Sequence, residues 1–417
     1  MLNQQPDMDV IICGGGIAGL TLALSLCAEG LSCCVFEARE DKTCTTSAIN
    51  LSPSGANVLA ELGLREAIEA KSQAVRFMRM LTAEGTLVAE FSLRGQEQYG
   101  SDAAAMTRRV LHEALVDRCK ALDIPIRYGC KFARLEQDAS GVTAVFADST
   151  RARARALVGA DGIHSTVRQC MFPELRVEKR GRGYYGCGAI VPLRHLAPEE
   201  QQMLRLSEGS MNVMNGPAGF AGFMGVGVPD DGDAKFLFWT HISHAQAGDG
   251  FDPRDLRQVK QVLLAQRGSW GSPVGKIVAL LDQELPDVEV SCGPIVSLAP
   301  IASWSTERAV LIGDAAHGFG PGAHGAALAM EDAALLARLL KQTDDWSSAF
   351  KRFEVKRRPR VERIGNAAEA RNDKRLQGQG YWSAKAREWA MWLVGWWSGS
   401  RHYDPEYAYR VEHDTRD

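Results

Sequence analysis

The feature that most limits how this chain can fold is a glycine-rich turn close to its first residue. Residues 9–13 predict a short buried strand, residues 17–29 carry leucines and alanines at helical spacing, and residues 32–36 predict a second buried strand. The turn between the first strand and the helix has the spacing G-x-G-x-x-G, at Gly14, Gly16 and Gly19. A strand, turn, helix and strand in fewer than 30 residues make a right-handed βαβ unit, whose strands must pair in parallel. The chain is therefore predicted to contain an α/β sheet.

This turn is typical of a dinucleotide site. Glycines allow a tight turn and a close approach of the backbone to a pyrophosphate, and the helix N-terminus adds partial positive charge. Glu37 ends the second strand, 18 residues after Gly19, where it can accept hydrogen bonds from ribose hydroxyls. An acid at this position favours a 2′-hydroxyl over a 2′-phosphate, so FAD or NAD(H) is expected here rather than NADP(H).

The rest of the chain changes pattern twice. A helix over 107–122 and strands over 125–128, 131–136 and 142–147 continue the α/β pattern, the last two as a hairpin. From 184 to 297, short apolar or alternating runs with glycine-rich breaks predict an antiparallel sheet. After Trp304 the α/β pattern returns. The first domain is therefore predicted to be discontinuous.

Two further motifs follow predicted strands. In the first, over 159–168, Asp161 can cap the next helix, and taken alone this motif is an ordinary helix start. In the second, Gly-Asp-Ala-Ala-His at 313–317, Asp314 lies at the carboxyl end of a parallel-type strand, where open α/β sheets bind ligands. The small residues around Asp314 let a flat group approach the backbone.

The three motifs, in this order and at these separations, resemble those of the FAD-dependent monooxygenases of the para-hydroxybenzoate hydroxylase fold, and are most similar to the salicylate hydroxylase branch. The resemblance spans nearly the whole chain, because 353–360 and 403–406 are also similar to later parts of that branch. It implies bound FAD, with NAD(P)H as a transient donor and dioxygen as co-substrate. It also implies that a flavin C4a-hydroperoxide transfers one oxygen atom to an electron-rich aromatic or polyketide- or terpenoid-like small molecule.

The implied fold class is α/β, with a discontinuous Rossmann-like FAD-binding domain, an inserted antiparallel-sheet substrate domain and a C-terminal helical tail. The expected boundaries are 1–75, 100–175 and 295–370 for the FAD-binding domain, 76–99 and 176–294 for the substrate-binding domain, and 371–417 for the tail. Five of the nine tryptophans lie in the tail. It can pack on the protein itself or on a dimer partner, cover the substrate entrance, or contact a membrane surface.

Carried over residue by residue, the resemblance implies cofactor contacts along the whole nucleotide domain. They are Gly14, Gly16 and Gly19 at the pyrophosphate, Glu37 at the ribose, Arg39 near the adenine, Ala48 beside the isoalloxazine, Arg108 with Arg109 as the competing assignment, Asp161, Asp314 at the ribityl chain, and Gly325 and Ala326 at a helix N-terminus. That N-terminus stabilises negative charge on the reduced flavin by about 0.3 to 2 kcal/mol. Pro321 falls beside the reactive flavin carbon. The stretch from His317 to Glu331 is one residue shorter than usual, which leaves the registry of Gly325 and Ala326 open.

The substrate contacts are less defined. Several family members have an arginine on the first strand of the substrate sheet, but 185–190 contains none, so a carboxylate substrate is disfavoured. The catalytic candidates are His241, which could accept a phenolic proton, Tyr185 and Pro321. Further candidates are Tyr184 and His244 for polar contacts and Phe223, Met224, Phe238 and Trp239 for apolar walls. The competing interpretation of each is a strand side chain packed in the core or facing water.

Composition disfavours other classes of function. The 48 lysines and arginines nearly balance the 51 acidic residues and form no long block, so nucleic-acid binding is not expected. The first basic residue is Arg39, so the apolar stretch 10–28 lacks the positive start of a secretory signal, and a cytoplasmic protein is expected. The expected assembly is a monomer or a homodimer. The ten cysteines show no C-x-x-C or zinc-type spacing, so they are expected to be reduced, small apolar residues, and no metal site is expected.

Three other functions are compatible with the same nucleotide site. They are epoxidation or oxidative ring modification in secondary metabolism, flavin reduction or dehydrogenation without oxygen transfer, and non-catalytic nucleotide binding. Rapid NAD(P)H oxidation with oxygenation of a product would favour an oxygenase over the last two. Bound but unreactive flavin would favour the non-catalytic protein.

Overall fold

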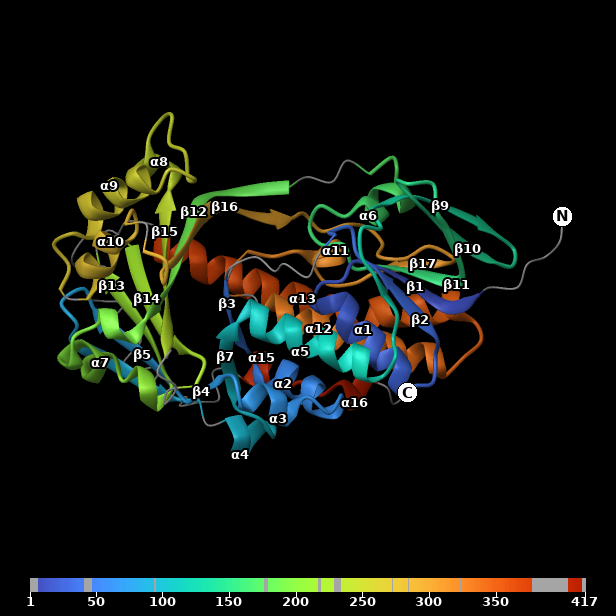
Figure 1. Cartoon of the computed structure of the whole chain (residues 1–417), viewed down its shortest axis with the longest axis horizontal. Helices are drawn as coiled ribbons and strands as arrows, with labels where there is room; N and C mark the ends of the chain where they lie inside the picture. Colours follow the sequence, from blue (N-terminus) through green and yellow to red (C-terminus); the bar gives the residue numbers. More distant parts are fainter. Residues whose placement is uncertain are drawn as a thin grey trace.

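Two seven-stranded β-sheets organise the molecule, one toward each end of its long axis (Figure 1). The structure is a computed structural model that describes residues 7–40, 47–93, 95–175, 179–216, 219–228, 234–271, 273–283, 285–320, 322, 324–376 and 404–414. The α/β sheet and the second, β-rich unit expected from the sequence are both present.

The first sheet contains the predicted βαβ unit. β1 (Met8–Cys13) pairs in parallel with β2 (Cys33–Phe36), and α1 (Ile17–Ala28) forms the crossover. The other strands are β8 (Ile126–Arg127), β9 (Phe132–Asp138), β10 (Gly141–Phe146), β11 (Arg151–Gly159) and β17 (Ala309–Leu311), in the order β8-β2-β1-β11-β10-β9, with β17 beside β11. β9 and β10 form the predicted hairpin. β17 joins β11 in parallel from far along the chain, which confirms that this unit is discontinuous.

Helices cover the first sheet. α1 lies against α12 (Gly325–Lys341) and α5 (Arg108–Ala121), and its leucines are at most 1% exposed. A helix that is apolar on every side must be buried in this way. The Thr107 hydroxyl accepts a hydrogen bond from the Val110 N–H and caps α5. The long helix α13 (Trp346–Leu376) packs against α12 and also contacts β14 of the second sheet, so it links the two units.

The second sheet is antiparallel as predicted, except at one pair of strands, which makes it mixed. Its order is β16 (Glu289–Leu298), β12 (Lys179–Pro192), β15 (Lys235–Ser243), β14 (Gly219–Val226), β13 (Ser210–Gly216), β5 (Phe77–Thr82) and β6 (Leu87–Ser92). All neighbours are antiparallel except β13 and β5, which are parallel. The reason is that the hairpin of β5 and β6 comes from much earlier in the chain and adds to the edge of a sheet formed by later strands.

The two faces of the second sheet have different neighbours. Phe223, Phe236 and Phe238 are fully buried in one cluster with the side chains of α9 (Leu256–Arg267) and α10 (Val274–Leu280). Because successive side chains of a strand alternate between faces, Met224 and Trp239 point to the opposite face. That opposite face is the one turned toward the first sheet's side of the molecule (Figure 1).

A three-stranded antiparallel sheet lies between the two large ones (Figure 1). It consists of β3 (Ala48–Leu51), β7 (Ala103–Thr107) and β4 (Gln73–Val75). The remaining described helices are α2 (Pro53–Glu61), α3 (Arg65–Glu69), α4 (Gly95–Tyr99), α6 (Thr166–Met171), α7 (Pro198–Leu204), α8 (His244–Ala247), α11 (Asp314–His317), α15 (Asp404–Tyr407) and α16 (Val411–Asp414). β3 also contacts α12 in the middle of the molecule.

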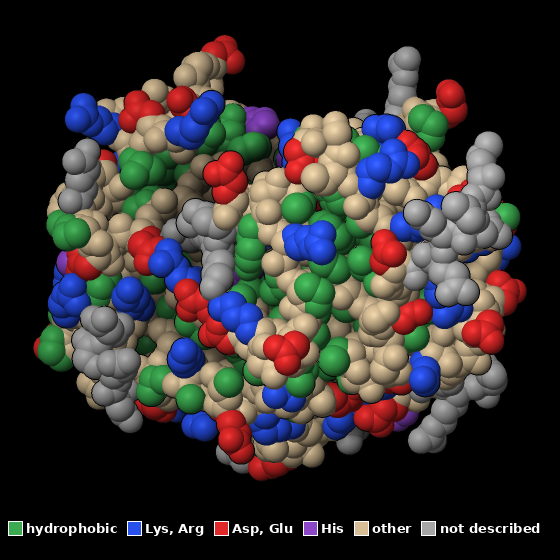
Figure 2. Space-filling model, turned by 45° about the vertical axis from the view of Figure 1, so that its right-hand side comes forward, with side chains coloured by type: hydrophobic (Ala, Val, Ile, Leu, Met, Phe, Trp, Pro, Cys, Tyr) green, Lys and Arg blue, Asp and Glu red, His purple; other side chains and the backbone are tan. Residues whose placement is uncertain are grey.

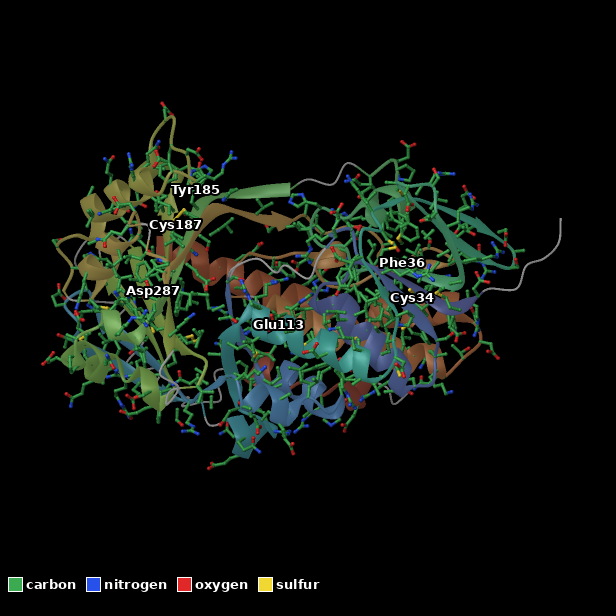
Figure 3. All side chains as sticks on the ribbon, viewed as in Figure 1. Cys34, Phe36, Glu113, Tyr185, Cys187 and Asp287 are labelled. Carbon is green, nitrogen blue, oxygen red and sulfur yellow. A yellow bond between two sulfur atoms is a disulfide. The ribbon has the colours of Figure 1, made fainter. Side chains whose placement is uncertain are left out.

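The cysteines depart from expectation at one pair. Cys187 on β12 and Cys292 on β16 face each other directly, with Cα atoms 4.2 Å apart, and are joined by a disulfide (Figure 3). The expectation of reduced cysteines is corrected for this pair, because antiparallel register brings two thiols together that are far apart in sequence. Elsewhere burial dominates: it raises the pKa of the Cys34 thiol to about 11, as suits a small apolar residue.

The tryptophan-rich part of the tail, 382–397, lies outside the described residues. Within the described ranges, no helix has the length and apolar character needed to cross a membrane. On the face shown in Figure 2, acidic and basic side chains are interspersed among the residues drawn in colour.

Candidate active site

A cavity of about 1440 Å³ connects the two sheets. It starts at the carboxyl ends of β1 and β2, passes between β3 and the N-terminus of α12, and ends on the face of the second sheet that α9 and α10 leave uncovered. Open α/β sheets bind their ligands at the carboxyl ends of the strands, so the first part of the cavity is where a nucleotide is expected.

The glycine turn forms the wall at the start of the cavity. Gly14 has φ +113°, and a Cβ there would overlap the carbonyl oxygen of Ala160, so only glycine suits the position. Gly16 is the N-cap of α1, and no side chain caps this N-terminus, so the first N–H groups remain for a ligand. Gly19 lies one turn along α1, where a Cβ would overlap the Gly14 carbonyl. Gly14 and Gly16 thus line the cavity, while Gly19 allows the helix to pack beneath the turn.

Glu37 holds this turn by its carboxylate. The Gly15 N–H donates to Oε2 at 2.7 Å, and the Arg39 backbone N–H and Nε donate to Oε1 at 3.0 and 3.1 Å. Burial alone raises the pKa of Glu37, but the hydrogen bonds from Arg39 and Gly15 outweigh it, so its pKa lies below the usual 4.5. Glu37 is therefore a charged acceptor at the wall of the cavity. His112 on α5 supports the turn from the other side, since its Nε2 lies 2.9 Å from the Gly15 carbonyl.

Asp161 caps α6, as predicted. Its Oδ2 accepts from the N–H groups of Thr166 at 2.8 Å and Val167 at 3.1 Å. Its Oδ1 is buried and has no hydrogen-bond partner in the described part of the chain. Burial raises the pKa of this carboxyl group. Because Asp161 lines the cavity, the unsatisfied oxygen suits a ligand that carries hydroxyl groups.

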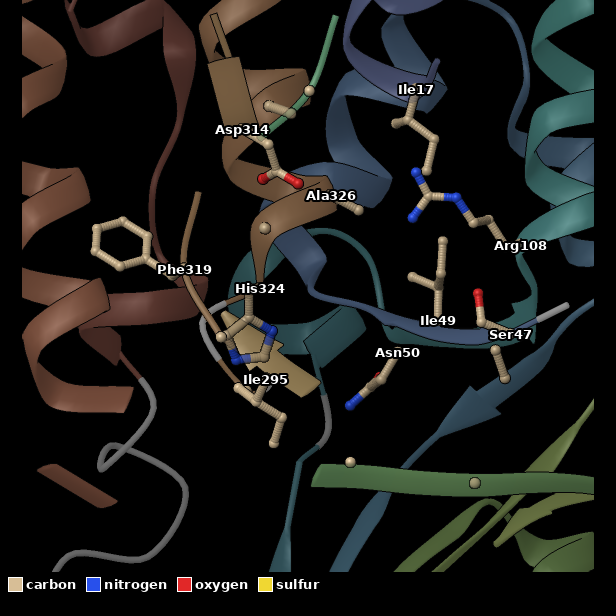
Figure 4. Close-up of a pocket in the computed structure, with 18 of the residues that line it drawn as sticks. Ile17, Ser47, Ile49, Asn50, Arg108, Ile295, Asp314, Phe319, His324 and Ala326 are labelled. Atoms are coloured by element: carbon tan, nitrogen blue, oxygen red, sulfur yellow. The ribbon is translucent and has the colours of Figure 1, made fainter. Parts of the chain in front are cut away.

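The central part of the cavity gathers most of the other predicted cofactor residues (Figure 4). Asp314 begins α11 immediately after β17, and its Oδ1 is 3.8 Å from the position of a Cβ on Gly325. The predicted cofactor residues that line this part are Ala48, Arg108, Asp314, Gly325 and Ala326. Arg108 rather than Arg109 lies at the cavity, since Arg109 is exposed. Pro321 lies outside the described residues.

Comparison with known proteins decides the family. The family described as FAD binding domain matches residues 7–225, more than half of the chain. The chain belongs to the FAD binding domain family. The region matched includes the glycine turn, Glu37, Arg108 and Asp161, all placed along the same cavity.

Full-length relatives agree with this assignment. The chain is 29% identical to an FAD-dependent urate hydroxylase of Klebsiella pneumoniae over 391 residues, which cover 91% of this chain and 95% of the relative. It is 29% identical to a 3-amino-4-hydroxybenzoate 2-monooxygenase of Streptomyces cremeus over 381 residues, 87% of this chain and 86% of that one. The crystal structure of Klebsiella pneumoniae HpxO with FAD and uric acid has a TM-score of 0.79, 26% identity and 94% coverage of both chains. The fold is that of the class A FAD monooxygenases, and the protein is an FAD-dependent oxidoreductase.

The residues present fit FAD. Two helix N-termini without side-chain caps, those of α1 and α12, face the cavity and can meet the pyrophosphate and the isoalloxazine. The Glu37 carboxylate and the unsatisfied Asp161 oxygen are acceptors for sugar hydroxyls. FAD would then be held by Gly14, Gly16, Glu37, Arg39, Ala48, Arg108, Asp161, Asp314, Gly325 and Ala326, and it would supply redox chemistry at the centre of the cavity.

We predict that Glu37→Gln weakens FAD binding about tenfold. The amide has one acceptor oxygen instead of two, so it cannot accept from both Gly15 and Arg39 and still receive a ribose hydroxyl; a hydrogen bond to a charged group contributes about 1.5–3 kcal/mol. The dissociation constant is measured by quenching of FAD fluorescence. Because the pKa of Glu37 is lowered, the difference in affinity between the wild type and Glu37→Gln should persist as the pH falls to 4.5 and shrink only below it.

Glu113→Gln is the matched control, because Glu113 is exposed on α5 (Figure 3). It should bind FAD as the wild type does. Equal affinity of Glu37→Gln and Glu113→Gln would contradict the role given to Glu37.

The far end of the cavity is a hollowed, mostly apolar sheet face. Trp239 lies flat over Gly222, where a Cβ would overlap the indole, and Gly186 and Gly188 leave space on the neighbouring strand. Four methionines line the same wall, Met78, Met80, Met211 and Met224. Methionine adapts to irregular ligand shapes, so the wall suits a sizeable organic molecule.

His241 faces this part of the cavity and is 4% exposed. Its ring packs edge-on against Phe220 with centroids 4.9 Å apart, and its carbonyl accepts from Arg267 at 2.9 Å. Met224 and Trp239 also line the cavity as proposed, whereas Phe223 and Phe238 point to the helices on the other face.

Tyr185 is not brought to the cavity, which corrects its choice as a catalytic candidate. Its ring packs against His244 at 4.7 Å and Phe251 at 4.9 Å (Figure 3). The physical reason is alternation along β12, which places Tyr185 on the same face as Cys187 and Ala189, in the cluster beneath α9 and α10. The closely spaced glycines of 181–188 hide this alternation in the sequence. Tyr184 is likewise not among the residues that line the cavity.

The polar and aromatic residues of the cavity that sequence reasoning missed include Asn50, His324, Glu406 and Tyr407. Asn50 follows the predicted isoalloxazine stretch, and its Oδ1 is a buried acceptor without a partner in the described residues. His324 directly precedes Gly325 and Ala326, two of the predicted cofactor residues, and this position is a signal that could have been followed. Glu406 and Tyr407 reach the cavity from the tail, and no local pattern marks them.

Proposed function

We propose that this protein is an NAD(P)H-dependent monooxygenase that transfers one atom of dioxygen to an electron-rich aromatic or polyketide- or terpenoid-like small molecule. The observation that carries the proposal is the continuity of the cavity. One space runs from the nucleotide edge of the first sheet, past the N-terminus of α12, to the glycine-hollowed face of the second sheet. A cofactor and an organic substrate can therefore meet in it.

The reaction balances with these components. NAD(P)H, a proton, dioxygen and the substrate give NAD(P)⁺, water and the product with one added oxygen atom. When bound, FAD would supply the redox chemistry that links oxidation of NAD(P)H to reduction of dioxygen. The role of dioxygen is supported by the monooxygenase name of a relative, and a monooxygenase needs a two-electron donor, the role proposed for NAD(P)H.

The chain's own residues bind, orient and exclude water. Glu37 and the glycine turn fix the nucleotide, and the methionines and Trp239 keep water from the reacting centre. His241, through a ring nitrogen, accepts the proton of a phenolic hydroxyl. The phenolate that results is the better nucleophile toward an electrophilic oxygen.

The charge of the wall supports a neutral substrate. Among the described residues that the second sheet contributes to the cavity, there is no lysine or arginine, and there is one carboxylate, Glu289. Burying a substrate carboxylate without a cationic partner costs several kcal/mol of binding free energy. Each 1.4 kcal/mol lowers the affinity about tenfold. The chain therefore favours neutral, electron-rich rings over benzoates.

We predict that a neutral naphthol raises the rate of NAD(P)H oxidation by about tenfold or more relative to 3-amino-4-hydroxybenzoate. The reason is the cost of burying the benzoate charge. The assay follows NAD(P)H absorbance and oxygen uptake under isotopically heavy dioxygen, and mass spectrometry should find one heavy oxygen atom in the naphthol product. Stimulation without a labelled product would favour the reductase; equal stimulation by both compounds would contradict the neutral substrate class.

Gly188→Leu provides the control for position. Its side chain would enter the cavity, with the nearest atoms of Phe238 and Leu237 at 3.3 and 3.9 Å from the new Cβ. It should remove the naphthol response and leave FAD binding unchanged. Gly181→Leu, on an exposed part of the same strand, should retain the response.

A further inference from the structure

His324 is an unusual residue to find at the start of α12. It is the N-cap of the helix, with φ 52° and ψ 38° in the left-handed region, where residues other than glycine are uncommon. It lines the cavity beside Gly325 and Ala326, across from Asn50 on β3 (Figure 4). A strained backbone at such a place persists only when the surroundings hold it.

Two residues of α15 hold the His324 ring. Its Nε2 lies 2.9 Å from Oε2 of Glu406, and the two side chains are only 16% and 9% exposed. The ring also meets the Tyr407 ring edge-on, with centroids 5.8 Å apart. The imidazole is thus fixed from the tail of the chain, not from its own loop.

Glu406 is itself firmly anchored. Arg371 donates to its Oε1 at 2.6 Å, and Arg360 donates to its backbone carbonyl at 3.1 Å. Arg360 also makes two 2.8 Å bonds to Glu331 on α12. Burial raises the pKa of Glu406, but the hydrogen bond and charge of His324 and the charge of Arg371 outweigh it and hold the pKa at about 2. Glu406 is therefore a fixed carboxylate at neutral pH.

The other ring nitrogen of His324, Nδ1, has no hydrogen-bond partner within the described ranges, and the ring faces the cavity at the centre where the isoalloxazine is expected. Reduction of a flavin places negative charge on N1 and the C2 carbonyl, and fixed donors or cations nearby stabilise that charge. We propose that His324, as an imidazolium whose Nε2–H donates to Glu406 and whose Nδ1–H can donate to the isoalloxazine of FAD, stabilises reduced FAD, with Glu406 as the residue that positions it. The inference depends on FAD binding by this family and not on the choice of substrate or on oxygen transfer.

The test is the two-electron midpoint potential of bound FAD in His324→Gly and His324→Gln. Glycine adopts the left-handed conformation more readily than histidine, so His324→Gly should fold as well as the wild type. Both variants should stabilise reduced over oxidised FAD about tenfold less, which is a fall of about 30 mV for a two-electron couple. The potential is measured anaerobically against a reference dye with FAD in excess. An unchanged potential in both variants would overturn the assignment of His324.

Glu406→Gln separates positioning from charge. If Glu406 acts through His324, the midpoint potential of FAD bound to Glu406→Gln should fall as it does in His324→Gly. The potential of the double variant should then be no lower than that of His324→Gly. If Glu406 acts only as a nearby negative charge, its removal should raise the potential in both backgrounds, which would overturn its positioning role. Glu412→Gln, an exposed acid of the same segment, should leave the potential unchanged. None of these outcomes depends on a product being formed, so the proposed monooxygenase reaction is tested separately.

Discussion

Gly14→Val should purify without flavin and should bind added FAD about 100-fold more weakly than the wild type, or worse. A valine at φ +113° is strained by about 1–3 kcal/mol, and its Cβ would overlap the carbonyl oxygen of Ala160 at the end of β11. The turn must then move away from β11, and the N–H groups at the start of α1 move with it. Because each 1.4 kcal/mol is a factor of ten in affinity, strain and displacement together reach this loss.

The measurement is the flavin content of purified protein, followed by titration with FAD. Gly250→Val is the matched control, since Gly250 has φ +79°, is exposed and has no atom within 4 Å of a new Cβ. It carries similar backbone strain away from the site and should retain FAD. Native affinity in Gly14→Val would show that the turn does not need glycine and would contradict its placement at the pyrophosphate.

Arg357→Leu should lower the free energy of unfolding by about 3–5 kcal/mol at neutral pH. Arg357 is fully buried between two carboxylates, with Nε 2.7 Å from Asp332 and Nη1 2.8 Å from Glu331. Burial raises the pKa of Asp332, but the charges of His317 and Arg357 outweigh it, so its pKa lies well below the usual range. Leucine would leave these carboxylates buried with one cation fewer.

The pH dependence follows from the sign of these shifts. In the wild type, the stability that Asp332 contributes is present above its unfolded pKa and is lost only as the pH falls through its lowered folded pKa. Without Arg357 the folded pKa values of both carboxylates rise. Protonation near their usual pKa range then removes the buried negative charge that destabilises the variant. The difference in unfolding free energy should therefore shrink between neutral pH and about pH 4.5.

Urea unfolding at both pH values tests this. Lys351→Leu, on an exposed position of the same helix, should change stability by no more than about 0.5 kcal/mol. A difference for Arg357→Leu that grows toward acid pH would contradict the charge-based account.

The sequence predicted those parts of the molecule that depend on neighbours along the chain. The turn at Gly14, the hairpin of β9 and β10 and the Asp161 cap of α6 are each set by a few adjacent residues. Their patterns are local, and the structure places them as expected. The residues predicted to contact the cofactor line one cavity, apart from Gly19 and from Pro321, which lies outside the described residues.

Features that depend on distant partners were not predictable in the same way. The parallel pairing of β13 with β5 joins residues more than a hundred positions apart, and nothing in either strand specifies a direction. Tyr185 was misplaced because glycine neighbours conceal which face a strand side chain takes. The pair of His324 and Glu406 spans 82 positions, and neither side chain shows in sequence that the other will meet it.

The cavity draws one wall from Gly14 and another from Glu406, nearly the full span of the sequence. During synthesis Gly14 emerges from the ribosome long before Glu406 is added. The growing chain can therefore form the βαβ unit while the cavity is still open on the side of α15. Loading of FAD into its final surroundings is then an event that follows synthesis.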